Sequence, residues 1–144
     1  MRLTNLLTVV PLVVFLLSCS IEKNNTKPDV EKDLNYCSNQ ITKTLAEISG
    51  KDMMPRNIMD SLNNWKLVPV DISEWTVGFW PGILWYNYEN TQNKKDADIA
   101  VYYTELLNPL TKLPAYDHDL GFQIFCSYGN AYRLTGNNKY KQMF

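Results

Sequence analysis

Apolar residues recur at steps of three or four along residues 28–49, which is the pattern of an amphipathic helix. They form one stripe along the expected helix: Val30, Leu34, Cys37, Ile41, Leu45 and Ile48. Pro28 suits the first turn of this helix, and Gly50 suits its end. The pattern therefore predicts a helix over residues 28–49 with one buried face and one solvated face.

Residues 51–73 show no such period. Pro55, Pro69 and the pair Asn63-Asn64 interrupt any long element in this segment. We expect an irregular connection in which residues 65–71 form one short extended piece, and no other part of the chain shows a convincing strand pattern. A connection of this length in a compact domain is usually functional or packed as a lid.

Three more helices and the start of a fourth follow. Residues 81–90 are apolar on nearly all sides, which is typical of an inner helix covered by others. Residues 94–107 have one apolar side, and residues 121–134 form a strongly apolar helix that Gly136 ends. Another helix begins near Lys139. The fold class expected from these patterns is all-α.

A short motif occurs twice, once after each inner helix. It reads Tyr-x-x-Thr-x-Asn-x-Lys and begins at Tyr88 and again at Tyr132, an offset of 44 residues. A period of this size with two helices per unit predicts helical hairpins arranged in a stack or ring. Each hairpin hides its apolar face only against neighbouring hairpins, and the chain stops inside an apparent helix. We therefore expect residues 28–144 to be a truncated, N-terminal part of a larger helical domain.

The first 27 residues have the pattern of an export signal followed by a tether. A short positive start precedes the apolar run Leu6–Leu17, which is too short for a comfortable membrane span. The sequence Leu16-Leu17-Ser18-Cys19 resembles the bacterial lipobox, in which Cys19 would carry lipid after removal of residues 1–18. Residues 19–27 then form a polar, flexible tether. The alternative is an ordinary secretory signal that happens to end in cysteine.

The lipobox interpretation implies an exported bacterial lipoprotein that faces the periplasm or the outer-membrane surface. Its partner would be the membrane, through the lipid on Cys19. Nucleic acid is not an expected partner, because the formal net charge is -1 and no basic excess exists. The two remaining cysteines, Cys37 and Cys126, are expected to be buried free thiols rather than a disulfide.

The chemistry that the chain can offer is concentrated around its single histidine, His118, which lies between Asp117 and Asp119. Asp119 directly precedes an apolar run and suits the N-cap of a helix, where hydrogen bonds would fix its carboxylate. A fixed carboxylate can serve acid–base catalysis, although such a residue can equally be only a cap. His118 could donate protons or hydrogen bonds. A metal site is not expected, because no second histidine is present.

Trp75 lies just before the apolar helix at residues 81–90 and outside its packing stripe. Its indole could therefore face a cleft and stack on a sugar ring. It could equally pack back onto the helix as a hydrophobic staple. The sequence leaves both interpretations open.

Two runs resemble the unsaturated glucuronyl hydrolases of glycoside hydrolase family 88. The first is Glu74-Trp75-Thr76-x-Gly78-Phe79-Trp80-x-Gly82-Ile83-Leu84-Trp85, and the second is His118-Asp119-Leu120-Gly121-Phe122. They occur in the family's order and at a similar separation, and the resemblance covers residues 28–144. The unsaturated rhamnogalacturonyl hydrolases share the general fold and are the nearest alternative.

The resemblance implies an (α/α)6 barrel and a substrate left by polysaccharide lyases, an oligosaccharide that ends in a 4,5-unsaturated uronic acid. It implies hydration of the C4=C5 vinyl ether with no metal or organic cofactor. Asp119 matches one of two active-site aspartates, Trp75 matches an aromatic residue of the substrate cleft, and His118 lines the same cleft. The principal acid–base aspartate lies on a later inner helix, beyond Phe144, and Asp117 does not replace it. We therefore expect the 144 residues alone to be inactive. A non-catalytic helical-repeat lipoprotein that binds glycans or a partner is the competing interpretation.

Overall fold

The computed structural model describes residues 27–58, 63–114 and 118–144. The elements follow in the order α1 (Val30–Ile48), β1 (Met54–Ile58), β2 (Trp65–Val68), the 3-10 helix η1 (Trp75–Gly78), α2 (Phe79–Thr91), α3 (Lys94–Glu105), the 3-10 helix η2 (Leu110–Lys112), α4 (Leu120–Ile124), the π-helix η3 (Phe125–Gly129), α5 (Asn130–Thr135) and α6 (Asn138–Lys141). The predicted signal peptide, Cys19 and nearly all of the predicted tether lie outside the described residues. Within them, no helix is both long enough and apolar enough to cross a membrane.

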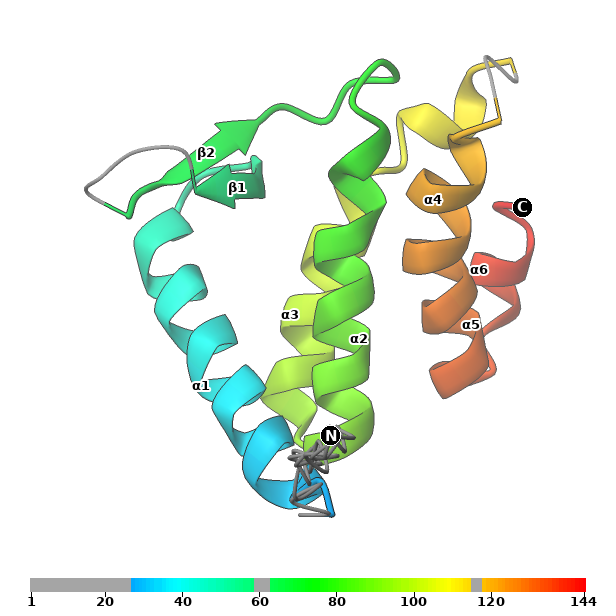
Figure 1. Cartoon of the computed structure of the whole chain (residues 1–144). Helices are drawn as coiled ribbons and strands as arrows, with labels where there is room; N and C mark the ends of the chain where they lie inside the picture. Colours follow the sequence, from blue (N-terminus) through cyan, green and yellow to red (C-terminus); the bar gives the residue numbers. More distant parts are fainter. Residues whose placement is uncertain (1–26, 59–62, 115–117) are drawn as a thin grey trace, which may run out of the picture.

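Helix α2 is the centre of the described structure (Figure 1). It contacts α1, α3, η3 and α5. The side chains of Leu84 and Trp85 on α2 are almost fully buried, and the Trp85 indole Nε1 donates a 2.8 Å hydrogen bond to Thr104 Oγ1 on α3. The prediction of an inner helix is confirmed on the side of Leu84 and Trp85, whereas Ile83 and Tyr86 of the same helix are 46% and 60% exposed.

The two copies of the sequence repeat adopt the same local structure. Gln92 and Gly136 occupy equivalent positions, and both have left-handed backbone conformations, with φ of 52° and 66°. In each copy the next residue caps the following helix, because Asn93 Oδ1 accepts from Lys95 N at 2.9 Å and Asn137 Oδ1 accepts from Lys139 N at 3.0 Å. The repeated motif is therefore a helix–turn–helix connection between an inner helix and the next outer one.

The inner helices of the two repeats are also joined to each other. Glu89 on α2 and Arg133 on α5 are 44 positions apart and form a two-pronged ion pair, with N–O distances of 2.6 and 2.7 Å. The Arg133 hydrogen bond is the main cause of a lowered pKa at the Glu89 carboxyl. Equivalent positions of neighbouring hairpins thus meet side by side, as a stack or ring of repeats requires.

A β-hairpin interrupts the helices, and the sequence predicted only half of it. The extended piece expected at residues 65–71 is confirmed as β2, but its antiparallel partner β1 was missed. Pro55 had argued against a strand there. In a two-stranded sheet both strands are edges, where proline can be tolerated. The pairing also contains a β-bulge, since Pro55 pairs with Leu67 and Asn57 pairs with Lys66, which leaves Arg56 as the extra residue.

The stripe of α1 is only half buried, which corrects the prediction. Ile41 and Ile48 are buried, whereas Val30 is 62% exposed and Cys37 is exposed. The hairpin covers the second half of α1, where Trp65 Nε1 donates to Thr44 Oγ1 at 3.2 Å. Among the described residues nothing covers the first half equally well. Cys126 is half-buried, and both cysteines are free thiols.

Candidate active site

The candidate residues Trp75 and Asp119 lie at one end of the helical bundle. Trp75 opens η1, which leads directly into α2, and Asp119 immediately precedes α4. Helix α4 contacts η1, and β1 of the hairpin also contacts η1. Figure 1 shows the start of α2, the start of α4 and the hairpin at the same end of the molecule. Residues separated by about 44 positions in the chain therefore meet at a common surface.

Three aromatic rings hold this surface together. The Trp75 ring centroid lies 5.6 Å from that of Phe79 and 5.8 Å from that of Phe122, and the Phe79 and Phe122 centroids are 5.6 Å apart. Trp75 nevertheless remains 40% exposed. The ring contacts support the interpretation that Trp75 packs onto the helices, and stacking on a sugar stays a prediction. One part of the indole packs on the helices, and another part is available to solvent or a ligand.

Two glycines allow η1 and α2 to approach the helix of Asp119 closely. A Cβ atom on Gly78 would lie 2.2 Å from the carbonyl oxygen of Phe122, and a Cβ on Gly82 would lie 2.7 Å from that of Cys126. Contacts this short with backbone atoms cannot be relieved by turning a side chain. The two glycines of the Trp75 run thus set the distance between Trp75 and the turn that carries Asp119.

Gln123 is a structural residue of this site that the sequence analysis missed. Its side chain is 1% exposed, and Nε2 donates to the carbonyl oxygens of Ile72 at 3.0 Å and Glu74 at 3.3 Å. These bonds connect α4 to the segment immediately before Trp75. An amide among the apolar residues 120–126 was the available signal, because buried polar groups require hydrogen-bond partners.

Asp119 occupies the N-cap position, as predicted, but it does not cap the helix with its side chain. The carboxylate makes no capping hydrogen bond, whereas the backbone oxygen of Asp119 accepts from Phe122 N at 2.8 Å. Its φ of -78° and ψ of -10° are already helical, and capping side chains usually fold back from an extended residue. The side chain of Asp119 therefore does not supply the capping hydrogen bond that the sequence predicted.

His118 lies beside Asp119 but in a much more open position. Its Nε2 is 3.5 Å from Asp119 Oδ1, and the side chain is 91% exposed, against 27% for Asp119. Asp117 lies outside the described residues. Among the residues that are described, no three His, Cys, Asp or Glu side chains group so that they could hold a metal ion.

The helix that follows Asp119 is less regular than predicted. Instead of one α-helix over residues 121–134, the five residues Phe125–Gly129 form a π-helix between α4 and α5. Ser127 Oγ donates back to the carbonyl oxygens of Gln123 at 2.5 Å and Ile124 at 3.1 Å. Short π segments inside α-helices frequently accompany functional sites, and this one begins six residues beyond Asp119.

Known proteins share this sequence and fold. No protein-family model matches the chain. An unsaturated chondroitin disaccharide hydrolase of Streptococcus agalactiae is 43% identical over 72 residues, which are 49% of this chain and 18% of that protein. An unsaturated glucuronyl hydrolase of Formosa agariphila is 29% identical over 142 residues, which are 96% of this chain and 35% of that protein.

Solved structures agree with the sequence matches. An unsaturated glucuronyl hydrolase specific for heparin matches with a TM-score of 0.68 and 36% identity, over 79% of this chain and 29% of that one. The enzyme from Streptococcus agalactiae gives a TM-score of 0.65 at 32% identity, over 79% of this chain and 30% of that one. The chain is related to the unsaturated glucuronyl hydrolases. It spans about a third or less of the length of these relatives.

The relationship to unsaturated glucuronyl hydrolases confirms the fold prediction. The chain has part of their helical barrel fold. The roles of Asp119, Trp75 and His118 stay predictions, although the structure brings Trp75 and Asp119 to one surface.

Proposed function

We propose that the protein containing this chain hydrolyses oligosaccharides whose non-reducing end is a 4,5-unsaturated uronic acid. The observation that carries the proposal is the match to unsaturated glucuronyl hydrolases in both sequence and fold. The position of Trp75 and Asp119 at one end of the bundle supports it. In this proposal the exposed part of the Trp75 indole stacks on a sugar ring. His118, whose side chain is 91% exposed, lines the same cleft in this proposal.

The reaction adds water across the vinyl ether. A proton is delivered to C4, water adds to C5, and the resulting hemiketal opens to release the unsaturated sugar as a keto acid. Asp119 would hold the substrate. It would also shift the pKa of a second aspartate, which the family resemblance places beyond Phe144. Two close carboxylates raise the pKa of one of them, which keeps an acid protonated near neutral pH.

The test follows the ultraviolet absorbance of the C4=C5 bond in the full reading frame that encodes this chain. Substrates are unsaturated disaccharides from glycosaminoglycan lyase digests. Asp119→Asn should lower turnover by roughly 100-fold or more, the size of an acid–base contribution. Asp98→Asn is the matched control, because Asp98 is exposed and pairs only with Lys94 on the surface. Equal turnover in the wild type and Asp119→Asn would exclude the role of Asp119.

The substrate series also separates the alternatives. Activity only on unsaturated rhamnogalacturonan fragments would replace the glucuronyl assignment with the rhamnogalacturonyl one. No turnover of either class, together with measurable binding of the same sugars, would support a non-catalytic glycan-binding protein.

We further propose that the protein is exported and anchored to a membrane through lipid on Cys19. The run Leu16-Leu17-Ser18-Cys19 supports this proposal. Bacterial cells that express Cys19→Ser should release the protein from the membrane fraction and fail to attach labelled fatty acid to it. Cys37→Ser is the control and should remain membrane-bound. Retention of label in Cys19→Ser would contradict the anchor.

A further inference from the structure

We propose that the β-hairpin beside Trp75 forms an anion-binding subsite, in which Lys66 and Arg56 contact a sulfate ester or carboxylate on a sugar that follows the unsaturated one. This inference rests on the proposed function. It adds a specificity element outside the pair Trp75 and Asp119.

The subsite is an open hollow of about 410 Å³ between the hairpin and η1. Its lining residues are Arg56, Asn57, Lys66, Trp75 and Thr76. Trp75 thus belongs both to the aromatic cluster next to the Asp119 turn and to this hollow. A sugar that stacks on the indole would have the hollow beside it, because Trp75 lines the hollow together with two residues of β1 and one of β2.

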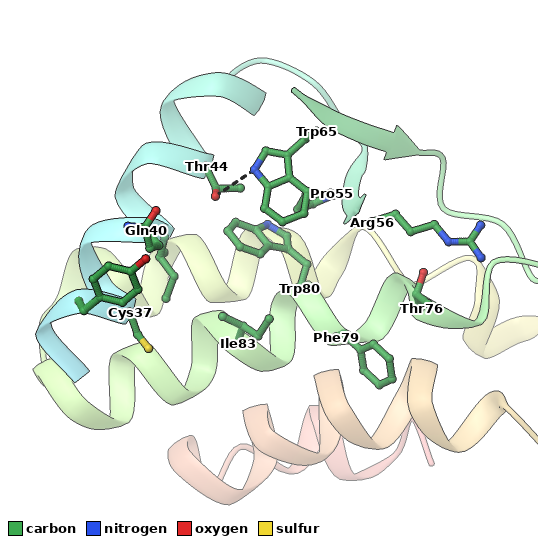
Figure 2. Close-up of a pocket in the computed structure, with 12 residues that line it drawn as sticks. Cys37, Gln40, Thr44, Pro55, Arg56, Trp65, Thr76, Phe79, Trp80 and Ile83 are labelled. Atoms are coloured by element: carbon green, nitrogen blue, oxygen red, sulfur yellow. Dashed lines mark hydrogen bonds between the residues drawn. The ribbon is translucent and has the colours of Figure 1, made fainter. Parts of the chain in front are cut away.

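The β-bulge explains how two cations reach one hollow. Asn57 and Lys66 are paired across the strands, so their side chains share a face, and Arg56 is the extra residue next to Asn57. Bulges re-aim side chains and are common next to active sites. Figure 2 shows Arg56 extending from the hairpin above Thr76 of η1. A regular pairing would alternate Arg56 and Asn57 between opposite faces.

The charge of the hollow favours an anion. No carboxylate lines it, and Lys66 has no ion-pair partner among the described residues. Arg56 contacts Glu74, but only through Nη1, at 2.9 and 3.3 Å from the two carboxylate oxygens. Its other guanidinium N–H groups have no hydrogen-bond partner within the described part of the chain, and a guanidinium fork matches the planar or tetrahedral oxygens of carboxylate and sulfate.

A plain structural role for Lys66 must be distinguished from this one. Exposed lysines on edge strands discourage pairing with other chains, and β2 is an edge strand. That role predicts no dependence on the substrate's charge. The test therefore compares the ratio of kcat/KM between charged and uncharged substrates, rather than the rate on a single substrate.

The experiment compares Lys66→Gln with wild type, in the full reading frame, on three unsaturated substrates. These are a disaccharide sulfated on the second sugar, the same disaccharide without sulfate, and an unsulfated tetrasaccharide that carries a second uronate. Lys66→Gln should lower kcat/KM for the sulfated disaccharide by about threefold, the size of one exposed charge contact, and leave the unsulfated one unchanged. A loss on the tetrasaccharide instead would identify carboxylate as the bound anion. The selectivity should also weaken as salt rises.

Two variants sharpen the result. Lys95→Gln on the outer helix α3 is the matched control and should change no substrate ratio. Arg56→Lys keeps a positive charge beside Glu74 but removes the additional N–H groups, so it should shift the ratio in the same direction as Lys66→Gln. Equal effects of Lys66→Gln on charged and uncharged substrates, or no effect on any, would overturn the proposal.

Failure of the subsite is distinguishable from failure of the proposed function. Absence of turnover of every substrate in the wild type would reject the proposed function. In that case calorimetric Kd values for the sulfated and unsulfated disaccharides decide the subsite. Preferential binding of the sulfated sugar that Lys66→Gln removes would support it, and equal Kd values would reject it.

Discussion

At the scale of single residues, Gln123 shows how one buried amide can organise the site. Its side chain is buried, and Nε2 donates hydrogen bonds to the carbonyl oxygens of Ile72 and Glu74, which lie shortly before Trp75. The side chain is a positioning group, since it connects the element of Trp75 to the element of Asp119. A buried amide without partners would be unfavourable, and the two Nε2 bonds offset part of that cost, while Oε1 has no hydrogen-bond partner among the described residues.

Gln123→Glu should lower the free energy of unfolding by about 2 kcal/mol, because a carboxylate of nearly the same shape cannot donate to the two carbonyl oxygens. It should also raise KM more than it lowers kcat, since Trp75 loses its support while Asp119 remains. Denaturant titration and steady-state kinetics measure the two effects. The control Gln142→Glu is on the exposed surface and should change stability by less than about 0.5 kcal/mol. An unchanged KM in Gln123→Glu would contradict the positioning role.

Tyr128 carries a second prediction at the residue scale. Its ring is fully buried, and its hydroxyl has no hydrogen-bond partner among the described residues. Burial is the main cause that raises the pKa of Tyr128 far above that of a free tyrosine. The folded protein therefore keeps this proton when the unfolded chain, whose tyrosines ionise near about pH 10, releases it. The contribution of protonated Tyr128 to the free energy of unfolding is therefore complete below about pH 10, and it is lost as the pH rises above that value.

Tyr128→Phe should accordingly weaken the fall in stability above about pH 10, measured as the unfolding free energy across a pH series. At neutral pH the variant should be equally stable or up to about 1 kcal/mol more stable, because it removes an unpaired buried hydroxyl. Tyr36→Phe, at an exposed position, should leave the alkaline profile unchanged. A loss of several kcal/mol at neutral pH in Tyr128→Phe would reveal a partner for the hydroxyl.

At the scale of elements, the close approach of η1 and α2 to the helix after Asp119 is the decisive packing feature. Gly78 and Gly82 both face backbone atoms of that helix. The aromatic cluster and the Gln123 bonds then hold the elements at this separation. The relation between Trp75 and Asp119 therefore depends on the absence of a Cβ atom as much as on any attractive contact.

Gly78→Ala should destabilise the protein by about 3 kcal/mol or more, because the added methyl group would overlap the Phe122 carbonyl and force backbone movement. Gly121→Ala is a matched control with the opposite sign. Its Cβ would meet nothing within 4 Å, so alanine should stabilise helix α4 by up to about 1 kcal/mol. Thermal unfolding measures both. A neutral Gly78→Ala would mean that η1 can move away from α4 at little cost.

At the scale of the whole molecule, the described structure exposes apolar side chains on two sides. Ile83 and Tyr86 of the central helix are 46% and 60% exposed, and Phe122 and Phe125 on the other side are 44% and 59% exposed. Helical repeats hide such faces against further repeats. Large exposed apolar patches on an isolated chain favour association.

Residues 28–144 expressed alone should therefore self-associate, with an apparent mass that rises with concentration in size-exclusion chromatography with light scattering. Binding of a hydrophobic dye should rise with it. Ile83→Lys combined with Phe125→Lys should reduce association, while Lys94→Glu, on the outer helix, serves as the control. A monomer at all concentrations would contradict this expectation.

The sequence by itself determined the helices, the repeat and the candidate residues. Periodicity is a local property, so the spacing of apolar residues predicts α1, α2 and α3. The motifs at Tyr88 and Tyr132 indicated that two segments are equivalent. Strand β1 did not follow, because its pairing with β2 is non-local and Pro55 obscured it. The same limit hid the exposure of Cys37, since burial depends on which element covers a face.

Only the tertiary structure brought Trp75 to the turn of Asp119 and showed that the aspartate does not cap its helix. It also revealed the parts that hold this arrangement, the two glycines and Gln123, and the hollow in which Lys66 and Arg56 meet. The physical reason is that chain spacing fixes which face of a helix a residue occupies, whereas distances between faces are decided by packing. In this protein the packing distance depends on two missing Cβ atoms and one buried amide.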